Sequence, residues 1–115
     1  MHNFRNMTIW KRSMDLSKKI LILTNDFPKE NRFDITSHII RSTISIPSNI
    51  AEGSSRRTSK EFSMFIDYSI GSAHELETQL LLAAELGLAD CLMLNQLINE
   101  LVIIQKMLVN FKKGI

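Results

Sequence analysis

The apolar residues of this chain recur every three or four positions over almost its whole length, and this spacing is the strongest constraint on its fold. Such spacing places apolar side chains on one face of an α-helix, whereas a half-buried strand would alternate apolar and polar residues. Sustained alternation is absent, and only four glycines and two prolines interrupt the 115 residues. The sequence therefore predicts an all-α protein built from a few long helices.

Helix-breaking and helix-capping residues mark the ends of the first two predicted helices. The first should run over about residues 8–26 and end at Phe27-Pro28, because the residue before a proline is disfavoured in a helical conformation. The second should run over about residues 34–52. Asp34 is its candidate N-cap, and Gly53 is suited to a left-handed C-cap.

Pro47 lies inside the second predicted helix. A proline at this position removes one backbone donor and clashes with the preceding turn. We therefore expect a kink near residues 43–47, with two separate half-helices as the alternative.

The third and fourth predicted helices are longer. Thr58-Ser-Lys-Glu61 has the form of a capping box, which predicts a helix from there to about Leu86 with Gly87 as its terminator. The last helix should span about residues 91–112. Four long helices joined by short loops favour an antiparallel up-down-up-down four-helix bundle, in which residues 1–115 form one domain.

The composition is that of an ordinary globular protein, with 44% hydrophobic and 23% charged residues. The longest strongly apolar stretches, residues 20–23 and 101–104, are far shorter than the roughly 20 residues of a membrane-spanning helix. The N-terminal residues lack the pattern of an export signal, so we expect a cytoplasmic protein without a membrane partner. Cys91 is the single cysteine, which excludes an internal disulfide and a thiolate metal cage.

Motifs for catalysis or metal binding are missing. Neither His38 nor His74 has a glutamate three residues before it, as a di-iron bundle would require. Glu75 and Glu77 are two positions apart on one predicted helix and so point in different directions. Glu77 falls near the apolar seam and needs a partner there, for which Arg41 is the best candidate. We expect no enzyme activity, no cofactor and no metal.

Two predicted helices carry more apolar surface than one bundle can bury. The apolar arc of the second helix covers about 160° and that of the fourth exceeds about 200°, against roughly 100° for a helix that faces only a core. A few exposed aliphatic side chains would be the simplest explanation. Association of several copies explains the excess better.

Charge is distributed unevenly along the chain. Residues 1–58 contain ten Lys and Arg against five Asp and Glu, whereas residues 59–90 contain one against six. The basic segment and the acidic segment can each simply form a solvent-exposed face. A basic and an acidic surface on one subunit also suit a ring in which each copy contacts the next through unlike surfaces.

Basic side chains in two places are candidate contacts for nucleic-acid phosphates. One group lies at the junction of the second and third predicted helices, and the other forms the outer face of the first. The first group is Arg56, Arg57 and Lys60, and the second is Lys11, Arg12, Lys18 and Lys19. The formal net charge is only +2 and the sequence pI of about 8.9 lies just below that of a dedicated nucleic-acid-binding domain.

The segment Arg41-Ser-Thr-Ile-Ser-Ile-Pro-Ser-Asn-Ile-Ala-Glu-Gly53 resembles the hallmark of the bacterial four-helix bundle family encoded in intervening sequences of 23S ribosomal RNA genes. Phe27-Pro28, Arg57-Thr-Ser-Lys-Glu-Phe62 and Gly71-Ser-Ala-His-Glu-Leu-Glu-Thr-Gln-Leu80 extend the resemblance over nearly the whole chain. The resemblance implies a homopentameric ring. It also implies a relation to the accessory protein of diversity-generating retroelements, which binds nucleic acid and its reverse transcriptase through basic surfaces. Thr43 stands where an alanine is commoner.

The polar residues of this motif also have a structural interpretation. Asn49 can bridge the backbone around the proline, Glu52 can pair with Arg41 or Arg56, and Gly53 can supply a turn. The residues that define the fold in this interpretation are Arg41, Ser45, Pro47, Asn49, Glu52, Gly53, Glu75 and Glu77. Two functional hypotheses follow: an oligomeric protein that binds RNA or DNA, and an adaptor that docks another polypeptide.

Overall fold

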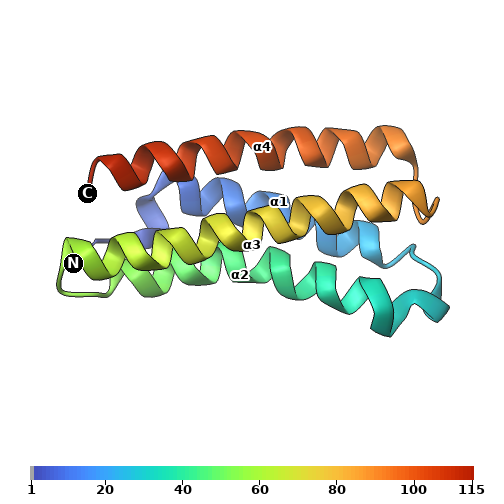
Figure 1. Ribbon diagram of the computed structural model, residues 1–115, viewed down its shortest axis with the longest axis horizontal. Coiled ribbons are helices and arrows are strands. Elements are labelled where there is room, and N and C mark those ends of the chain that lie inside the picture. Colours follow the sequence, from blue (N-terminus) through green and yellow to red (C-terminus); the bar gives the residue numbers. More distant parts are fainter. Residues whose placement is uncertain (1) are drawn as a thin grey trace.

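A computed structural model describes residues 2–115, and within them the chain forms four long helices and no strand (Figure 1). The helices are α1 (Thr8–Thr24), α2 (Ser37–Ser54), α3 (Ser59–Glu85) and α4 (Cys91–Lys113). They run antiparallel in sequence order along a bundle of 43 × 23 × 20 Å. The predicted all-α, up-down-up-down bundle is confirmed.

Short helical turns complete the chain before α1 and between α1 and α2. A 3-10 turn at Phe4–Asn6 precedes α1, a second at Lys29–Asn31 follows it, and a π-helical turn at Arg32–Thr36 leads into α2. In the bundle, α1 and α3 each pack against both α2 and α4, so α1 and α3 lie diagonally opposite. One face of every helix therefore points to a shared core. Its fully buried members include Leu16, Ile20, Ile46, Ile50, Ile66, Leu76, Leu80, Leu94, Leu101, Ile104 and Leu108.

The ends of α3 are as predicted. The Oγ1 atom of Thr58 accepts a hydrogen bond from the backbone N–H of Glu61 at 3.1 Å, which is the capping interaction. At the other end Gly87 has a left-handed φ of 68°. Its N–H donates to the carbonyl of Ala84, and that of Leu88 donates to the carbonyl of Ala83, the pair of bonds that closes a helix around such a glycine.

The two predicted caps of α2 are wrong. Asp34 lies inside the π-helical turn, and the residue before α2 is Thr36, whose side chain caps nothing. Gly53 is not beyond the helix, because α2 continues to Ser54. A Cβ atom at Gly53 would lie 2.7 Å from the Cβ of Phe65 and 2.9 Å from the Cδ1 of Phe62. Gly53 therefore allows the backbone of α2 to lie directly against α3.

Pro47 is accommodated inside an unbroken α2, which bends along its length in Figure 1, so the alternative of two half-helices is wrong. Proline lacks the N–H that would bond the carbonyl four residues earlier, that of Thr43. Ser17 of α1 supplies the missing donor, since its Oγ lies 2.9 Å from the Thr43 oxygen. The Thr43 hydroxyl in turn donates to Ser17 Oγ at 3.0 Å. A side chain on another helix thus completes the hydrogen bonding of α2.

Replacing Ser17 by alanine should lower the free energy of unfolding by about 2 kcal/mol, because a buried carbonyl would lose the donor that stands in for the missing N–H of Pro47. Ser13→Ala is the matched control on the same helix. Its Oγ donates at 2.7 Å to the carbonyl of Ile9, which the helix already bonds, so its loss should cost less than about 0.5 kcal/mol. Chemical denaturation of both variants measures the difference. Equal losses would contradict this role of Ser17.

By length and composition α4 is apolar enough to cross a membrane, with a mean hydropathy of 1.3 over 18 residues. The short apolar stretches alone had indicated that no segment has the composition of a membrane-spanning helix, and α4 corrects that indication. In the bundle, Leu94, Leu101 and Leu108 of α4 are fully buried among the other helices. Core helices of globular proteins often combine these properties, and the absence of a membrane partner stays a prediction.

Candidate nucleic-acid interface

The antiparallel topology brings three separate segments together at one end of the bundle. Both termini and the turn between α2 and α3 lie there (Figure 1). The N–H of His2 donates to the carbonyl of Ser54 at 3.2 Å, and the ring of Phe62 contacts those of His2 and Phe111 with centroids 4.9 and 5.4 Å away. An aromatic cluster therefore holds the N-terminus, the start of α3 and the end of α4 together.

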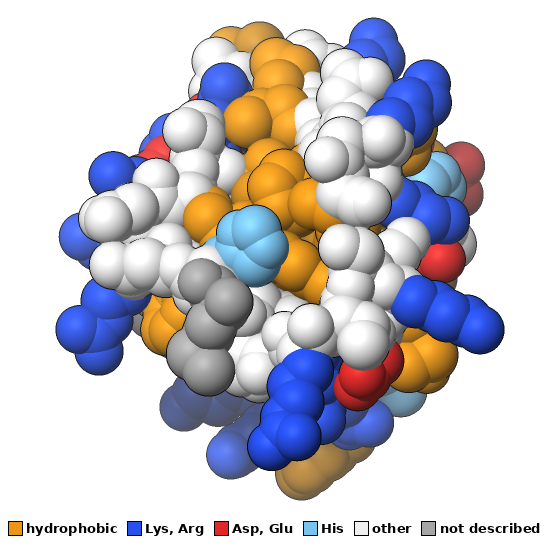
Figure 2. Space-filling model, turned by 90° about the vertical axis from the view of Figure 1, so that its left-hand side faces the viewer, with side chains coloured by type: hydrophobic (Ala, Val, Ile, Leu, Met, Phe, Trp, Pro, Cys, Tyr) orange, Lys and Arg blue, Asp and Glu red, His pale blue; other side chains and the backbone are white. Residues whose placement is uncertain are grey.

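Basic side chains surround this cluster. We call this surface the basic end. Figure 2 looks directly at it and shows Lys and Arg side chains around an apolar centre. Its residues are Arg5, Arg56, Arg57, Lys60, Lys112 and Lys113.

Arg57 and Lys60 are the two predicted phosphate contacts that are best placed at the basic end. Both side chains are exposed, and neither forms an ion pair with any residue from 2 to 115. Arg57 lies in the turn before α3 and Lys60 in the first turn of α3. Their charges are available to a ligand without breaking a contact inside the protein.

Arg56 has a different environment. Its Nη2 lies 3.0 Å from Oε1 of Glu52, as one alternative for Glu52 predicted, and its guanidinium stacks 4.7 Å from the ring centroid of Phe65. The side chain is half-buried. Arg56 therefore helps to fix the α2–α3 turn, and the ion pair reduces the charge that it can offer to a phosphate.

The four predicted contacts on α1 are all exposed, but they form no single surface with the basic end. Lys11 and Arg12 lie in the first turns of α1, close to the basic end, whereas Lys18 and Lys19 lie about halfway along the bundle. Lys19 is paired with Glu100 at 2.9 Å and with Asp15 at 3.3 Å. The hydrogen bond to Glu100, supported by Asp15, raises the pKa of Lys19 above its usual value.

Three members of the basic end were missed in the sequence analysis. Arg5 and Lys113 are exposed and unpaired among the described residues, while Lys112 bonds Asp67 at 2.8 Å. The signal that could have found them is the topology, because an even number of antiparallel helices returns both termini to the same end as the second turn.

Comparison with known proteins assigns the chain. The family model of the 23S rRNA-intervening sequence protein matches residues 5–110. The chain belongs to this family. A crystal structure of a protein of unknown function from the S23 ribosomal protein family of Bacteroides thetaiotaomicron VPI-5482 has the same fold, with a TM-score of 0.86 at 22% sequence identity, and covers 92% of this chain and 99% of that one. Comparison with curated proteins found no match.

The family motif on α2 is occupied by structural contacts. Asn49 Nδ2 donates to both the carbonyl and the Oγ of Ser45, each at 2.9 Å, and Ser45 Oγ lies 2.7 Å from Ser72 Oγ on α3. Asn49 thus bonds the turn preceding it and does not bridge the carbonyl that Pro47 leaves free. With Gly53, these contacts hold α2 close to α3.

Glu77 of the family motif has a partner other than the predicted Arg41. Its Oε1 accepts a hydrogen bond from Nε2 of Gln105 on α4 at 2.8 Å. Arg41 is exposed and pairs with no described carboxylate, so the predicted pair is wrong. A neutral amide satisfies the half-buried carboxylate, while Glu75 points to solvent, as its spacing from Glu77 predicted.

No cluster of three or more His, Cys, Asp or Glu side chains within residues 2–115 is arranged to hold a metal ion. His38 and His74 are both exposed. Cys91, the single cysteine of the sequence, is exposed at the start of α4.

Proposed function

We propose that this protein is a non-enzymatic, self-associating bundle in the bacterial cytoplasm that binds RNA or DNA phosphates through its basic end. The observation that supports this most directly is the pair Arg57 and Lys60, which are exposed on either side of the start of α3 and form no ion pair with residues 2–115. Phosphate contacts of this kind need available cations rather than a shaped pocket. The family is named after intervening sequences of 23S rRNA, and membership in it also supports the proposal of nucleic-acid binding.

Self-association would make such a small charge effective. The net charge of +2 per chain produces a weak field. In the homopentamer that the family resemblance implies, five copies at +2 each would carry about +10 and repeat the basic end five times, so that weak contacts add through multivalency. The relation to the accessory protein of diversity-generating retroelements stays a prediction.

The salt dependence of binding tests the basic end. The double substitution of Arg57 and Lys60 by alanine removes two cations per copy. For each copy in contact with the ligand, the slope of log affinity against log salt should become shallower by about 1.8 on duplex DNA or about 1.4 on a single strand. Filter binding to RNA and to duplex DNA across a salt series measures this slope.

Lys29 and Arg32 provide a matched control, since the same two residue types lie at the opposite end of the bundle. Their double substitution by alanine should leave the slope unchanged. An equal change in both double variants would mean that binding follows only net charge and would reject the basic end as the site.

A protein adaptor is the second candidate, and Phe33 favours it. This side chain is 83% exposed at the end opposite the basic end, with the Arg32 guanidinium 5.6 Å from its ring centroid, and an exposed aromatic ring suits a polypeptide ligand. Wild-type protein that retained neither RNA nor DNA at low salt would reject nucleic-acid binding and leave the adaptor as the better explanation.

A further inference from the structure

The outward face of α3 carries a largely apolar stripe, with one carboxylate in it, that the bundle leaves uncovered. Exposed residues recur along it at intervals of three and four positions or their multiples, which places them on one side of the helix. We call this surface the α3 stripe. Its residues are Met64, Tyr68, Gly71, Glu75, Leu82 and Leu86.

Gly71 is the unexpected member of the α3 stripe. It lies inside a 27-residue helix, where alanine would be more stable, and among residues 2–115 no atom outside the adjoining backbone of α3 lies within 4 Å of the position that its Cβ would take. Gly53, by contrast, is required by its contact with Phe65. Nothing within residues 2–115 requires glycine at position 71, whereas close approach of another backbone would.

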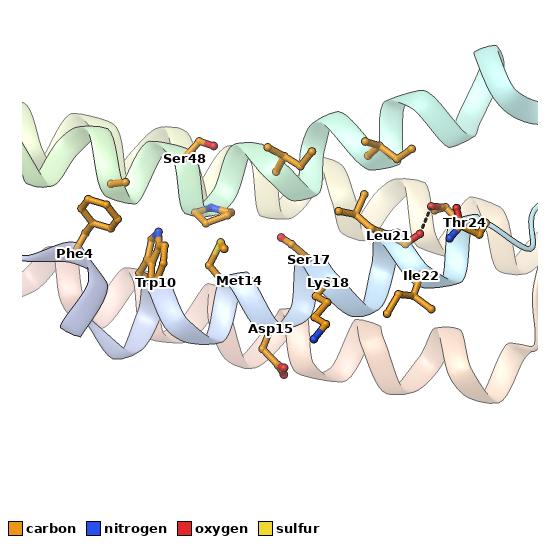
Figure 3. A pocket seen from close by; sticks show the side chains of 15 residues that line it. Phe4, Trp10, Met14, Asp15, Ser17, Lys18, Leu21, Ile22, Thr24 and Ser48 are labelled. Carbon is orange, nitrogen blue, oxygen red and sulfur yellow. Dashed lines mark hydrogen bonds between the residues drawn. The ribbon is translucent and has the colours of Figure 1, made fainter.

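A groove of complementary character runs between α1 and α2 on another side of the bundle (Figure 3). It has a volume of about 980 Å³, and Figure 3 shows Trp10 and Met14 extending from α1 toward α2. Ile22 and Ile44 also line it, with 59% and 45% of their surfaces exposed. A monomer would leave this apolar surface in water.

The stripe is long enough to span the groove, and the charges of the two surfaces are complementary. The groove follows α1 from Trp10 to Ile22, about 18 Å, and the stripe extends about 33 Å, so one helix can lie along the groove. Lys18 lines the groove, and Arg41 lines the adjoining hollow that shares Ile44. Asp15 is the one carboxylate in the groove, whereas α3 is acidic, with Glu75 in the stripe itself.

We propose that the α3 stripe of one copy docks into the α1–α2 groove of a second copy, with the two backbones closest at Gly71. Because α1 and α3 are diagonally opposite, the stripe and the groove face different directions. The contact is therefore heterologous, and its repetition builds a ring or a filament rather than a two-fold dimer. The inference rests on the self-association in the proposed function and is independent of nucleic-acid binding.

Two single substitutions test the pairing on the full chain. Tyr68→Asp should disable the stripe and Ile44→Asp the groove, so each variant alone should be a monomer by light scattering and sedimentation equilibrium. An equimolar mixture retains one intact stripe and one intact groove. It should therefore form a one-to-one dimer and nothing larger. Leu92→Asp, at a more exposed apolar position on α4 outside both surfaces, should associate like the wild type.

Gly71→Ala adds a second test, because it should stabilise the monomer but weaken its association. In the monomeric Ile44→Asp background it should raise the Tm by about 2–6 °C, because alanine favours the helix. In the otherwise wild-type chain the added methyl group should weaken association by at least about tenfold. A more stable monomer that associates as tightly as the wild type would overturn the close approach at Gly71.

The remaining outcomes separate this inference from the proposed function. A wild-type monomer at micromolar concentration would reject both the self-association and the docking. A wild-type oligomer with equally oligomeric Tyr68→Asp and Ile44→Asp variants would keep the self-association and reject these surfaces. Monomeric variants that fail to dimerise when mixed would reject the pairing of stripe with groove.

Discussion

Ile50→Asp is expected to leave the chain unfolded under native conditions. Ile50 has no exposed surface and packs at the centre of the core on α2. The substitution loses the burial of the aliphatic side chain, worth about 2–5 kcal/mol, and places a carboxylate in the core, which costs several kcal/mol more. The sum is comparable with the whole stability of a domain, about 5–15 kcal/mol. Circular dichroism and thermal unfolding of the purified variant measure the effect.

Ile44→Asp is the matched control for this substitution. It makes the same chemical change six residues earlier on α2, at a side chain that is exposed. The control should keep its helical spectrum and a cooperative thermal transition. A native Tm in Ile50→Asp would show that the apolar face of α2 is wrongly assigned.

Gly53→Ala should destabilise the protein by about 3 kcal/mol, in spite of the higher helix propensity of alanine. The new methyl group would lie 2.7 Å from the Cβ of Phe65 and 2.9 Å from the Cδ1 of Phe62. Rotation about χ1 moves the ring of Phe65 but not its Cβ, so α2 and α3 must separate. Chemical denaturation measures the loss.

Gly71→Ala provides the comparison, since it makes the same substitution inside a neighbouring helix where no described atom outside the adjoining helix backbone lies within 4 Å of the new Cβ. Both variants are best made in the Ile44→Asp background, so that association does not contribute. Their effects on the free energy of unfolding should have opposite signs. If Gly53→Ala also stabilised the protein, the two helices would have to lie further apart than the structure places them.

The fold was predictable because its signals are local. The capping box at Thr58 and the terminator Gly87 depend on residues within one or two turns, and both predictions are confirmed. The predicted cap at Gly53 was wrong because glycine serves a turn and a close helix contact equally well. Only the distance between α2 and α3 decides which applies. Asp34 was misassigned as an N-cap because the residues around it do not distinguish an N-cap from a π-helical turn.

The candidate site was less predictable, because helix packing and not local sequence brings several of its residues together. Arg57 and Lys60 are neighbours in sequence and could be grouped at once, whereas Arg5 and Lys113 join them only through the packing of four helices. Gln105 was overlooked as the partner of Glu77, because only the packing of α3 against α4 places the two side chains together. A buried amide on the facing helix satisfies it equally well.

The contact between Ser17 and the Thr43 carbonyl affects how the bundle can form. A helix usually contains all the donors that its interior carbonyls need, so it can grow by local steps. The chain around Pro47 cannot, because the missing donor lies 26 residues earlier in the sequence. Before α1 packs against α2, water must donate the hydrogen bond to that carbonyl. The middle of α2 then resembles two short helices that meet at a hydrated position. Continuity of α2 is therefore completed in the same step that excludes water between α1 and α2.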